Sequence, residues 1–198
     1  MFKKIKVPVE VSARHCHLSK ADLEKLFGIG YQLQEIKKLS QASDFACKEM
    51  VNAVVGTKRF ENVRVVGPLR EQTQVEISIT DSVGSGVIPP VKLSGDLACS
   101  GAVVLEGPMG KVELTEGLIV AQRHIHCGTE EAKGYRLKNG DVVSVKIASE
   151  RPVIFENVIV RVKDNYSLSL HIDTDEGNAA GINKTGEGQI YVAGFKLW

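Results

Sequence analysis

The chain contains an internal repeat, and this repeat constrains the fold more than any other feature of the sequence. The tetrapeptide Phe-Glu-Asn-Val occurs at residues 60–63 and again at 155–158. Each copy follows an Arg-His-X-His tetrad, at residues 14–17 and 123–126. A repeat of this length predicts two domains of similar build, each of about 100 residues, which is enough to bury a core.

The histidines are concentrated in the two tetrads. Four of the five, His15, His17, His124 and His126, lie in them, and His171 is the fifth. In an extended segment, residues i and i+2 point to the same side, so each tetrad offers two imidazoles to one ion. Two tetrads of this kind predict two metal sites, each in need of a third ligand. The alternative is two histidine pairs without metal.

The repeat indicates where the third ligands lie. Sixteen residues after the Phe of each tetrapeptide, the first half has Glu76 and the second half has His171. Both residues lie in strand-like segments, and three protein ligands leave one position open, as in catalytic zinc sites. The sequence therefore predicts two zinc ions per chain. Their predicted ligands are His15, His17 and Glu76 for the first ion and His124, His126 and His171 for the second.

The pattern of apolar and turn residues predicts a mainly β fold: two small β-barrels related by duplication and capped by short α-helices. One helix is expected over 20–27, capped by Ser19 and stopped by Gly28. A second is expected over 130–133, capped by Thr129 and stopped by Gly134. The expected strands are 7–13, 63–66, 74–79, 102–105, 118–122, 142–147, 153–155 and 157–162.

Composition excludes several classes of protein. The net charge is +1 with both signs well mixed, so no nucleic acid or membrane partner is expected. No apolar run approaches a membrane span, and the charged start of the chain does not resemble a secretory signal, so we expect a cytoplasmic protein. The cysteines, Cys16, Cys47, Cys99 and Cys127, are expected to be reduced. Alternation turns Cys16 away from the metal.

Arg70 stands six residues before Glu76. An even spacing on an extended segment directs its guanidinium to the metal side, where it suits a phosphate or a carboxylate. The alternative is a solvated arginine in a turn. Arg14 and Arg123 precede the tetrads, and we expect them to be structural ion-pair partners.

Two further segments belong to this hypothesis. Residues 82–101 hold much of the glycine and a Pro-Pro pair, and we interpret them as an ordered loop on the site. The acids of segment 173–176 could accept imidazole N–H groups; the segment lacks the loop of a calcium-binding EF-hand.

Four motifs together resemble those of a known family. They are Val-Ser-Ala-Arg-His-Cys-His-Leu-Ser at 11–19, Gly-Pro-Leu-Arg-Glu-Gln-Thr-Gln-Val-Glu-Ile-Ser at 67–78, Arg-His-Ile-His at 123–126, and Leu-His-Ile-Asp-Thr-Asp-Glu-Gly-Asn-Ala-Ala at 170–180. The chain resembles the phosphate propanoyltransferases, zinc-dependent phosphotransacylases of the propanediol-utilisation type, over about residues 7–181. Two residues depart from the family pattern: Cys16 replaces an aliphatic residue, and Gly177 stands where Ala is common.

The resemblance implies an enzyme that exchanges a short acyl group between coenzyme A and phosphate, with propanoyl-CoA as the expected donor, and direct attack by phosphate at a zinc site. It implies the same two ligand sets, Arg70 as the catalytic arginine, and contacts to CoA from Ser12, Lys37, Arg64 and Asn178. Two rival hypotheses are a zinc hydrolase and a CoA-binding protein with purely structural zinc.

The resemblance also implies that the strand before each tetrad belongs to the other half's barrel. The expected domains are therefore 14–121 and 1–13 plus 122–198. The sequence leaves open whether the chain forms homo-oligomers or associates with a bacterial microcompartment. Only six residues precede Val7, so targeting to a microcompartment lumen by an N-terminal extension is not expected.

Overall fold

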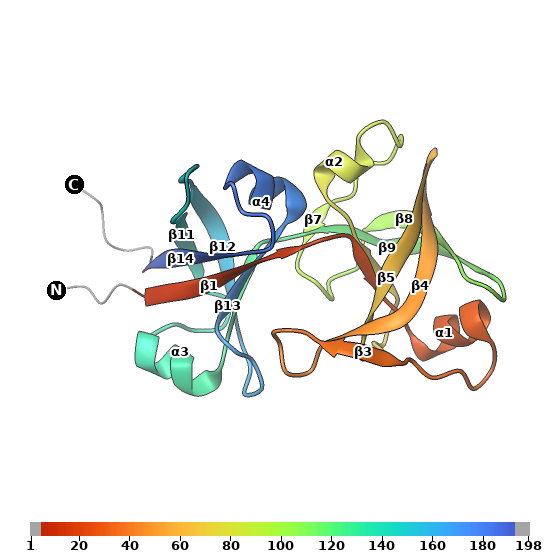
Figure 1. Ribbon diagram of the computed structural model, residues 1–198, viewed down its shortest axis with the longest axis horizontal. Helices are drawn as coiled ribbons and strands as arrows, with labels where there is room; N and C mark the ends of the chain where they lie inside the picture. Colours follow the sequence, from red (N-terminus) through yellow and green to blue (C-terminus); the bar gives the residue numbers. More distant parts are fainter. Residues whose placement is uncertain (1–4, 193–198) are drawn as a thin grey trace. The chain divides into compact units, whose positions relative to one another are not determined.

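The computed structural model describes residues 5–192, and strands make up most of its regular structure (Figure 1). The predicted mainly β fold is confirmed. Two compact units divide the chain. The middle unit is Ala13–Ala121, and the terminal unit combines Met1–Ser12 with Gln122–Trp198.

The terminal unit is a closed six-stranded barrel with the strand order β1-β13-β10-β12-β11-β14. Its strands are β1 (Ile5–Ser12), β10 (His124–Cys127), β11 (Val142–Ile147), β12 (Ile154–Val162), β13 (Ser169–Asp173) and β14 (Thr185–Val192). Its helices are α3 (Thr129–Tyr135) and α4 (Thr174–Ala179). β1 pairs with both β13 and β14, so the strand that precedes the first tetrad completes the barrel that holds the second.

The middle unit has the strand order β3-β4-β5-β2-β6-β9-β7, and β8 pairs with both β4 and β9. The six strands β4, β5, β2, β6, β9 and β8 therefore close a second barrel. The strands are β2 (His15–His17), β3 (Glu35–Lys38), β4 (Phe45–Val55), β5 (Lys58–Gly67), β6 (Gln74–Glu76), β7 (Val91–Lys92), β8 (Gly101–Glu106) and β9 (Lys111–Ala121). The helices are α1 (Lys20–Phe27) and α2 (Ile79–Ser82).

The sequence repeat reappears as a repeat of strand pairing. In the middle unit, β2 runs parallel to β5 and antiparallel to β6; in the terminal unit, β10 runs parallel to β12 and antiparallel to β13. The Asn of each Phe-Glu-Asn-Val copy, Asn62 and Asn157, has a left-handed φ of 56°. Asparagine adopts this conformation more readily than most residues. The two copies therefore share a backbone feature as well as a sequence.

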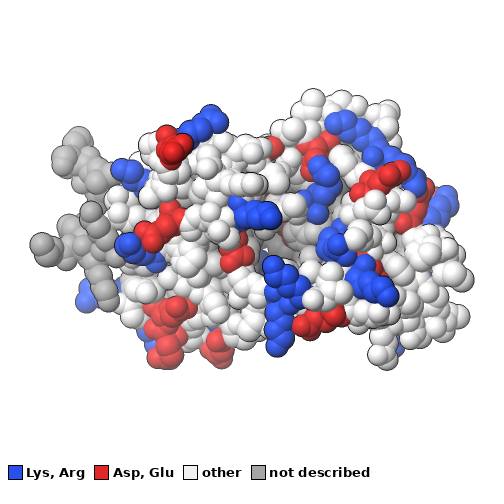
Figure 2. All heavy atoms as spheres, viewed as in Figure 1, with Lys and Arg blue, Asp and Glu red and all other residues white. Residues whose placement is uncertain are grey.

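Each barrel has its own apolar core, built from alternating strand positions. The middle core includes Cys16, Leu18, Val65, Leu105 and Leu118, all fully buried. The terminal core includes Val7, Ile125, Val145, Val160 and Leu170, also fully buried. On the face shown in Figure 2, acidic and basic side chains are interspersed, in keeping with the net charge of +1.

The first predicted helix is confirmed at both ends. The Ser19 hydroxyl accepts a hydrogen bond from the Asp22 N–H, and Gly28 ends α1 with a φ of 107°. The caps predicted for the second helix were wrong. Gly128 precedes α3, because the Thr129 hydroxyl bonds instead to Asp164, and Arg136 ends the helix in a left-handed conformation.

Helices α2 and α4 were not predicted, and the strand expected over 74–79 ends at Glu76. Both helices begin with a capping box, in which the side chains of the N-cap residue and of the third helical residue each accept a hydrogen bond from the other's backbone N–H. The pairs are Ser78 with Asp81 and Asp173 with Glu176, and their spacing in the sequence could have revealed both helices. Within residues 5–192, no helix is long and apolar enough to cross a membrane.

Candidate metal centre

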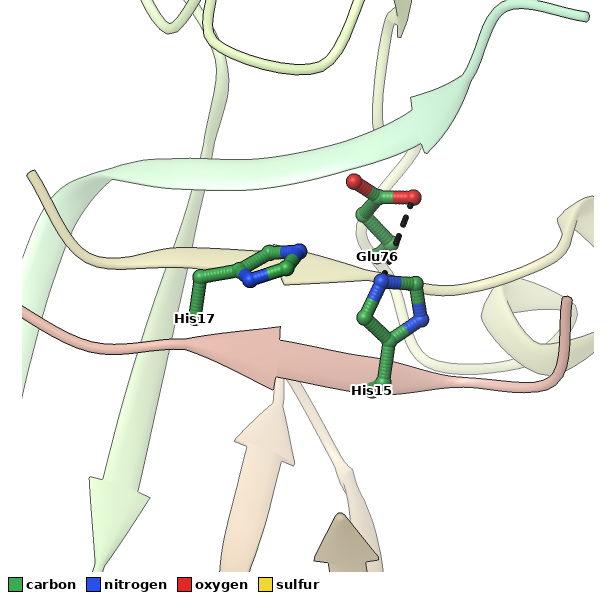
Figure 3. A group of neighbouring side chains, drawn as sticks. All are labelled: His15, His17 and Glu76. Atoms are coloured by element: carbon green, nitrogen blue, oxygen red, sulfur yellow. Dashed lines mark ion pairs between the residues drawn. The ribbon is translucent and has the colours of Figure 1, made fainter. Parts of the chain in front are cut away.

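Strand pairing in the middle unit brings the first predicted ligand set together. β2 and β6 are antiparallel, and His15 stands directly opposite Glu76 in their register. His17 lies on the same face of β2 as His15, while Cys16 between them is fully buried in the barrel core. Burial also raises the pKa of the Cys16 thiol. Cys16 is thus turned away from the ligand face shown in Figure 3, as the alternation predicted.

The three side chains are close enough to share one ion. A ligand atom from each of His15, His17 and Glu76 lies within 4.8 Å of the other two. The shortest ion-pair distance among them, His15 Nε2 to Glu76 Oε2, is 3.6 Å. The imidazole rings meet edge to face, with centroids 5.1 Å apart. Between residues 5 and 192, this is the one group of histidine, cysteine or acidic side chains that converges in this way.

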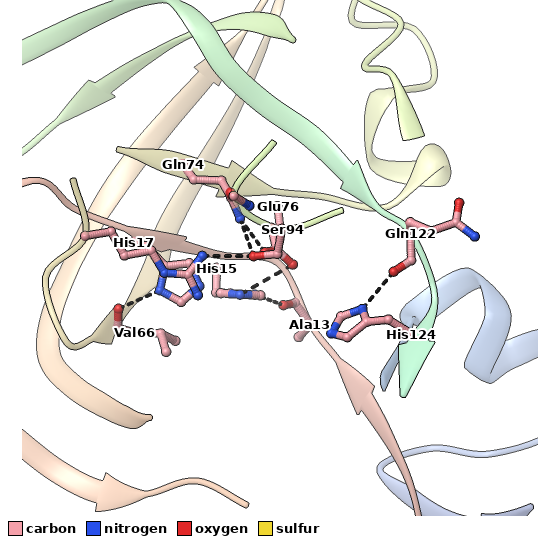
Figure 4. Close-up of polar contacts among 11 residues, drawn as sticks. Ala13, His15, His17, Val66, Gln74, Glu76, Ser94, Gln122 and His124 are labelled. Atoms are coloured by element: carbon pink, nitrogen blue, oxygen red, sulfur yellow. Dashed lines mark hydrogen bonds and ion pairs between the residues drawn. The ribbon is translucent and has the colours of Figure 1, made fainter. Parts of the chain in front are cut away.

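Backbone carbonyls orient both imidazoles (Figure 4). His15 Nδ1 lies 2.9 Å from the Ala13 oxygen, and His17 Nδ1 lies 2.9 Å from the Val66 oxygen. A carbonyl oxygen only accepts hydrogen bonds, so each Nδ1 carries the proton and each Nε2 keeps its lone pair for a metal. The donor set of two imidazole nitrogens and one carboxylate fits zinc.

The electrostatics favour the metal-binding protonation states. Burial alone raises the pKa of Glu76, but His15, His17, Ser94 and Arg70 together lower it to about 2. Burial, with the nearby His15 and Arg70, lowers the pKa of His17 to about 3. Near neutral pH, Glu76 is therefore a carboxylate and His17 a neutral imidazole, the forms that coordinate metals.

A polar network connects Glu76 with Arg70. The Gln74 amide nitrogen donates to the Glu76 carboxylate over 2.5 Å and to the Ser94 hydroxyl oxygen over 2.9 Å. Arg70 Nη1 donates to the same Ser94 oxygen over 2.8 Å. The Gly95 N–H donates to the Gln74 amide oxygen over 2.7 Å. The loop of residues 82–101 thus reaches the ligand set through Ser94 and Gly95, as expected.

Sequence reasoning did not single out Gln74 or Ser94. Gln74 stands two residues before Glu76 on β6, so alternation places both side chains on one face, and this spacing could have identified it. Ser94 lies in a loop, where no periodicity indicates direction. The backbone of Arg70 is held beside the end of β2, because its N–H donates to the Leu18 oxygen over 3.0 Å.

The second predicted set is assembled differently. His124 stands opposite His171 in the register of β10 and β13, and His124 Nδ1 lies 2.8 Å from the Gln122 oxygen. The His171 and His124 rings are stacked with centroids 5.5 Å apart, and His126 packs against Tyr166 at 4.2 Å. His171 Nε2 is engaged with the Ser169 hydroxyl over 2.9 Å.

The three rings of the second set lie together, with centroids 4.7 to 5.5 Å apart, but their ligand atoms do not converge as those of the first set do. The expectation of two zinc ions per chain is therefore not supported. The pairing of His124 with His171 follows the repeat, and so does the edge-to-face contact of His124 with His126, at 4.7 Å. A stacked pair of imidazoles presents its faces, not its nitrogen lone pairs, to each other.

The four predicted CoA contacts fall in both units. In the middle unit, Lys37 is exposed on β3, and Arg64 stands beside His15 in the parallel register, its guanidinium donating to the Cys47 oxygen over 2.8 Å. In the terminal unit, Ser12 ends β1 opposite Asp173, and Asn178 lies in α4.

Comparison with known proteins identifies the family. The family model described as phosphate propanoyltransferase matches residues 8–183. The chain belongs to this family. A phosphate propanoyltransferase of Thermotoga maritima is 47% identical over 188 residues, covering 94% of this chain and 89% of the relative. Those of Priestia megaterium and Clostridioides difficile are 48% and 43% identical, covering 91% and 92% of this chain and 83% and 87% of theirs.

Membership of the phosphate propanoyltransferase family makes the chain an enzyme of the transferase class. The matched residues include both tetrads, Glu76 and His171. The resemblance noted in the sequence motifs is thereby confirmed.

Proposed function

We propose that the chain transfers a short acyl group between coenzyme A and inorganic phosphate, with propanoyl-CoA as its substrate. The names of relatives at 41–48% identity support this acyl group and these partners. The observation that carries the proposal is the convergence of His15, His17 and Glu76 close to Arg70. A metal site beside a fixed cation suits a reaction that develops negative charge on a carbonyl oxygen or a thiolate.

His15, His17 and Glu76 would hold one zinc ion. Bound there, the ion would supply Lewis-acid chemistry, polarising the thioester carbonyl or stabilising the thiolate that leaves. Three protein ligands leave a coordination position for a substrate oxygen or sulfur. The carbonyl oxygens of Ala13 and Val66 keep both imidazoles in the tautomer that binds metal.

Arg70 is the proposed catalytic residue. Its guanidinium holds the phosphate dianion in a planar fork, and the Ser94 hydroxyl orients that fork. A phosphate oxygen then attacks the acyl carbonyl carbon, a C–O bond forms, the C–S bond breaks, and its electron pair leaves on the CoA sulfur, which takes up the proton that the phosphate gives up. Acyl-CoA and phosphate become acyl phosphate and CoA. Holding phosphate at the carbonyl makes the attack effectively intramolecular.

No acyl-enzyme is needed. Cys16, the cysteine between two ligands, is fully buried, and its raised pKa keeps it a thiol. Cys16 faces the barrel core, away from both imidazoles, and their Nε2 lone pairs are the proposed zinc donors, so neither histidine is available as its base.

Contacts to CoA are proposed at Lys37 and Arg64 in the middle unit and at Ser12 and Asn178 in the terminal unit. The exposed ammonium of Lys37 suits a phosphate group of CoA. Arg64 stands beside the ligand His15, where a substrate thioester would lie.

Release of CoA from acetyl-, propanoyl- and butanoyl-CoA, with and without phosphate and with and without chelator, tests the proposed function. We expect release that requires phosphate, yields acyl phosphate and stops with chelator. Equal release without phosphate would identify a hydrolase instead. No release with zinc and phosphate present would leave only a binding or structural role.

A further inference from the structure

Arg14, the residue directly before the first ligand, forms a two-pronged ion pair with Asp81. Its Nε donates to Asp81 Oδ2 over 3.1 Å, and its Nη2 donates to Oδ1 over 2.5 Å. The Asp81 side chain is only 11% exposed, whereas the Arg14 side chain is 44% exposed. A bidentate pair with one buried partner fixes relative position far better than a loose surface contact.

Asp81 is itself fixed to the chain segment that follows Glu76. It is the third residue of α2, where its carboxylate accepts from the Ser78 N–H over 3.3 Å. The Ser78 hydroxyl in turn accepts from the Asp81 N–H over 3.2 Å. Ser78 stands two residues after Glu76. The capping box therefore holds Asp81 at a fixed position relative to the segment that carries Glu76.

Arg14 has a second anchor on the other side of β2. Its guanidinium lies over the Phe60 ring, 5.1 Å from the centroid, and Phe60 belongs to β5, which runs parallel beside β2. β2 and β6 have only three residues each, so few ladder hydrogen bonds hold His15 opposite Glu76. The Arg14 contacts with Asp81 and Phe60 add side-chain interactions at the end of this short ladder, next to His15.

The same arrangement occurs in the terminal unit. Arg123, which precedes His124, pairs with Glu176 at 2.9 Å and lies over the Phe155 ring at 5.3 Å. Glu176 closes the capping box of α4. It stands five residues after His171 (171 + 5 = 176), as Asp81 stands five residues after Glu76 (76 + 5 = 81). The ion pair of the arginine and its contact with phenylalanine therefore occur at the same place in both copies of the repeat.

We propose that Arg14 is a positioning residue: through Asp81 and Phe60 it holds the strand that carries His15 to the segment that carries Glu76, and so keeps His15 opposite Glu76 in the metal site. This inference rests on the proposed metal binding by His15, His17 and Glu76. It predicts that the Arg14–Asp81 pair changes metal affinity without touching the metal.

Zinc affinity of the purified full-length protein, measured by competition with a chromophoric chelator, tests this inference. Arg14→Gln should bind zinc at the first set about tenfold or more weakly, as for other residues that orient ligands. Arg14→Lys keeps the charge but cannot make both bonds, so its affinity should also fall. Arg59→Gln is the control, because the Arg59 side chain is about as exposed as that of Arg14 and forms an ion pair with Glu106, which is not a proposed ligand.

A double variant isolates the pair. Arg14→Gln should weaken zinc binding less in an Asp81→Asn background than in the wild type, because only the contact with Phe60 is then left to lose. Unfolding of the zinc-free variants monitors stability separately, so a loss of affinity in a variant that unfolds like the wild type reflects positioning.

The outcomes separate the two proposals. If the wild type binds zinc no more tightly than His15→Ala, the metal site itself is wrong and the inference about Arg14 falls with it. If the wild type binds tightly, His15→Ala does not, and both Arg14 variants match the wild type, only the positioning role is overturned.

Discussion

His15 and Glu76 stand opposite each other in the register of β2 and β6, with 3.6 Å between the His15 Nε2 and a Glu76 carboxylate oxygen. Residues 61 positions apart in the sequence (76 − 15 = 61) thus become neighbours through a ladder of only three residues on each strand. This register adds the Glu76 carboxylate to the histidine pair of β2, and the three side chains together form a candidate metal site.

Replacing Glu76 with Gln should weaken zinc binding at the first set by at least about tenfold, because an amide is a neutral and poorer ligand than a carboxylate. Acyl transfer should fall with it. Zinc affinity by chelator competition, with Glu106→Gln as the control for loss of a carboxylate at an ion pair outside the site, checks this prediction. Unchanged affinity in Glu76→Gln would remove Glu76 from the ligand set.

Arg70→Ala should lower kcat/KM by roughly 100-fold or more while zinc stays bound, as expected for loss of a preorganised charge in a reactive site. Ser94→Ala should cause a smaller loss, because Ser94 orients the guanidinium without carrying charge. Steady-state kinetics with phosphate varied, together with the zinc content of each variant, separate the two effects. Near-normal turnover in Arg70→Ala would refute its catalytic role.

Cys16→Ser should retain acyl transfer, because the buried thiol takes no part in the proposed chemistry. It should lower the free energy of unfolding by about 1–3 kcal/mol, since a hydroxyl replaces a thiol in an apolar core. Chemical unfolding and the CoA-release assay check both parts. Complete loss of turnover in a folded Cys16→Ser variant would instead indicate an acyl-enzyme on Cys16.

The stability of the zinc-free protein should depend on pH through His17. The pKa of His17 is about 3 in the folded protein and near 6.5 when unfolded, so between these values the unfolded chain binds more protons. The contribution of neutral His17 to the stability of the fold is fully present above pH 6.5 and is lost as the pH falls toward 3. Unfolding in the presence of chelator should show this decline in the wild type and a weaker one in His17→Gln. Parallel pH profiles would contradict it.

Local patterns were sufficient for part of the fold. Ser19 and Gly28 predicted α1, and the apolar alternation of 142–147 predicted β11. β4 was not predicted, because Glu49 interrupts its apolar face. The burial of this carboxylate is explained only by distant partners, the Tyr31 hydroxyl at 2.8 Å and the Gln34 N–H.

In the candidate site, too, some features could be predicted from local sequence and others depend on distant partners. Arg14 and Arg123 were expected to form ion pairs, and both do, but their partners Asp81 and Glu176 are more than 50 residues away and carry no local signature. Ser94 was missed for the same reason: its contacts with Arg70 and Gln74 join a loop to a strand across the unit.

The repeat, the residue types of the two ligand sets and the spacing that relates Glu76 to His171 can all be predicted from the order of residues alone, because strand alternation and duplication are visible there. Which set converges depends on contacts between distant residues. Backbone carbonyls hold His15, His17 and also His124, but in the second set Ser169 engages His171 and Tyr166 packs against His126. Side-chain direction depends on such long-range contacts, and spacing along the chain does not encode them.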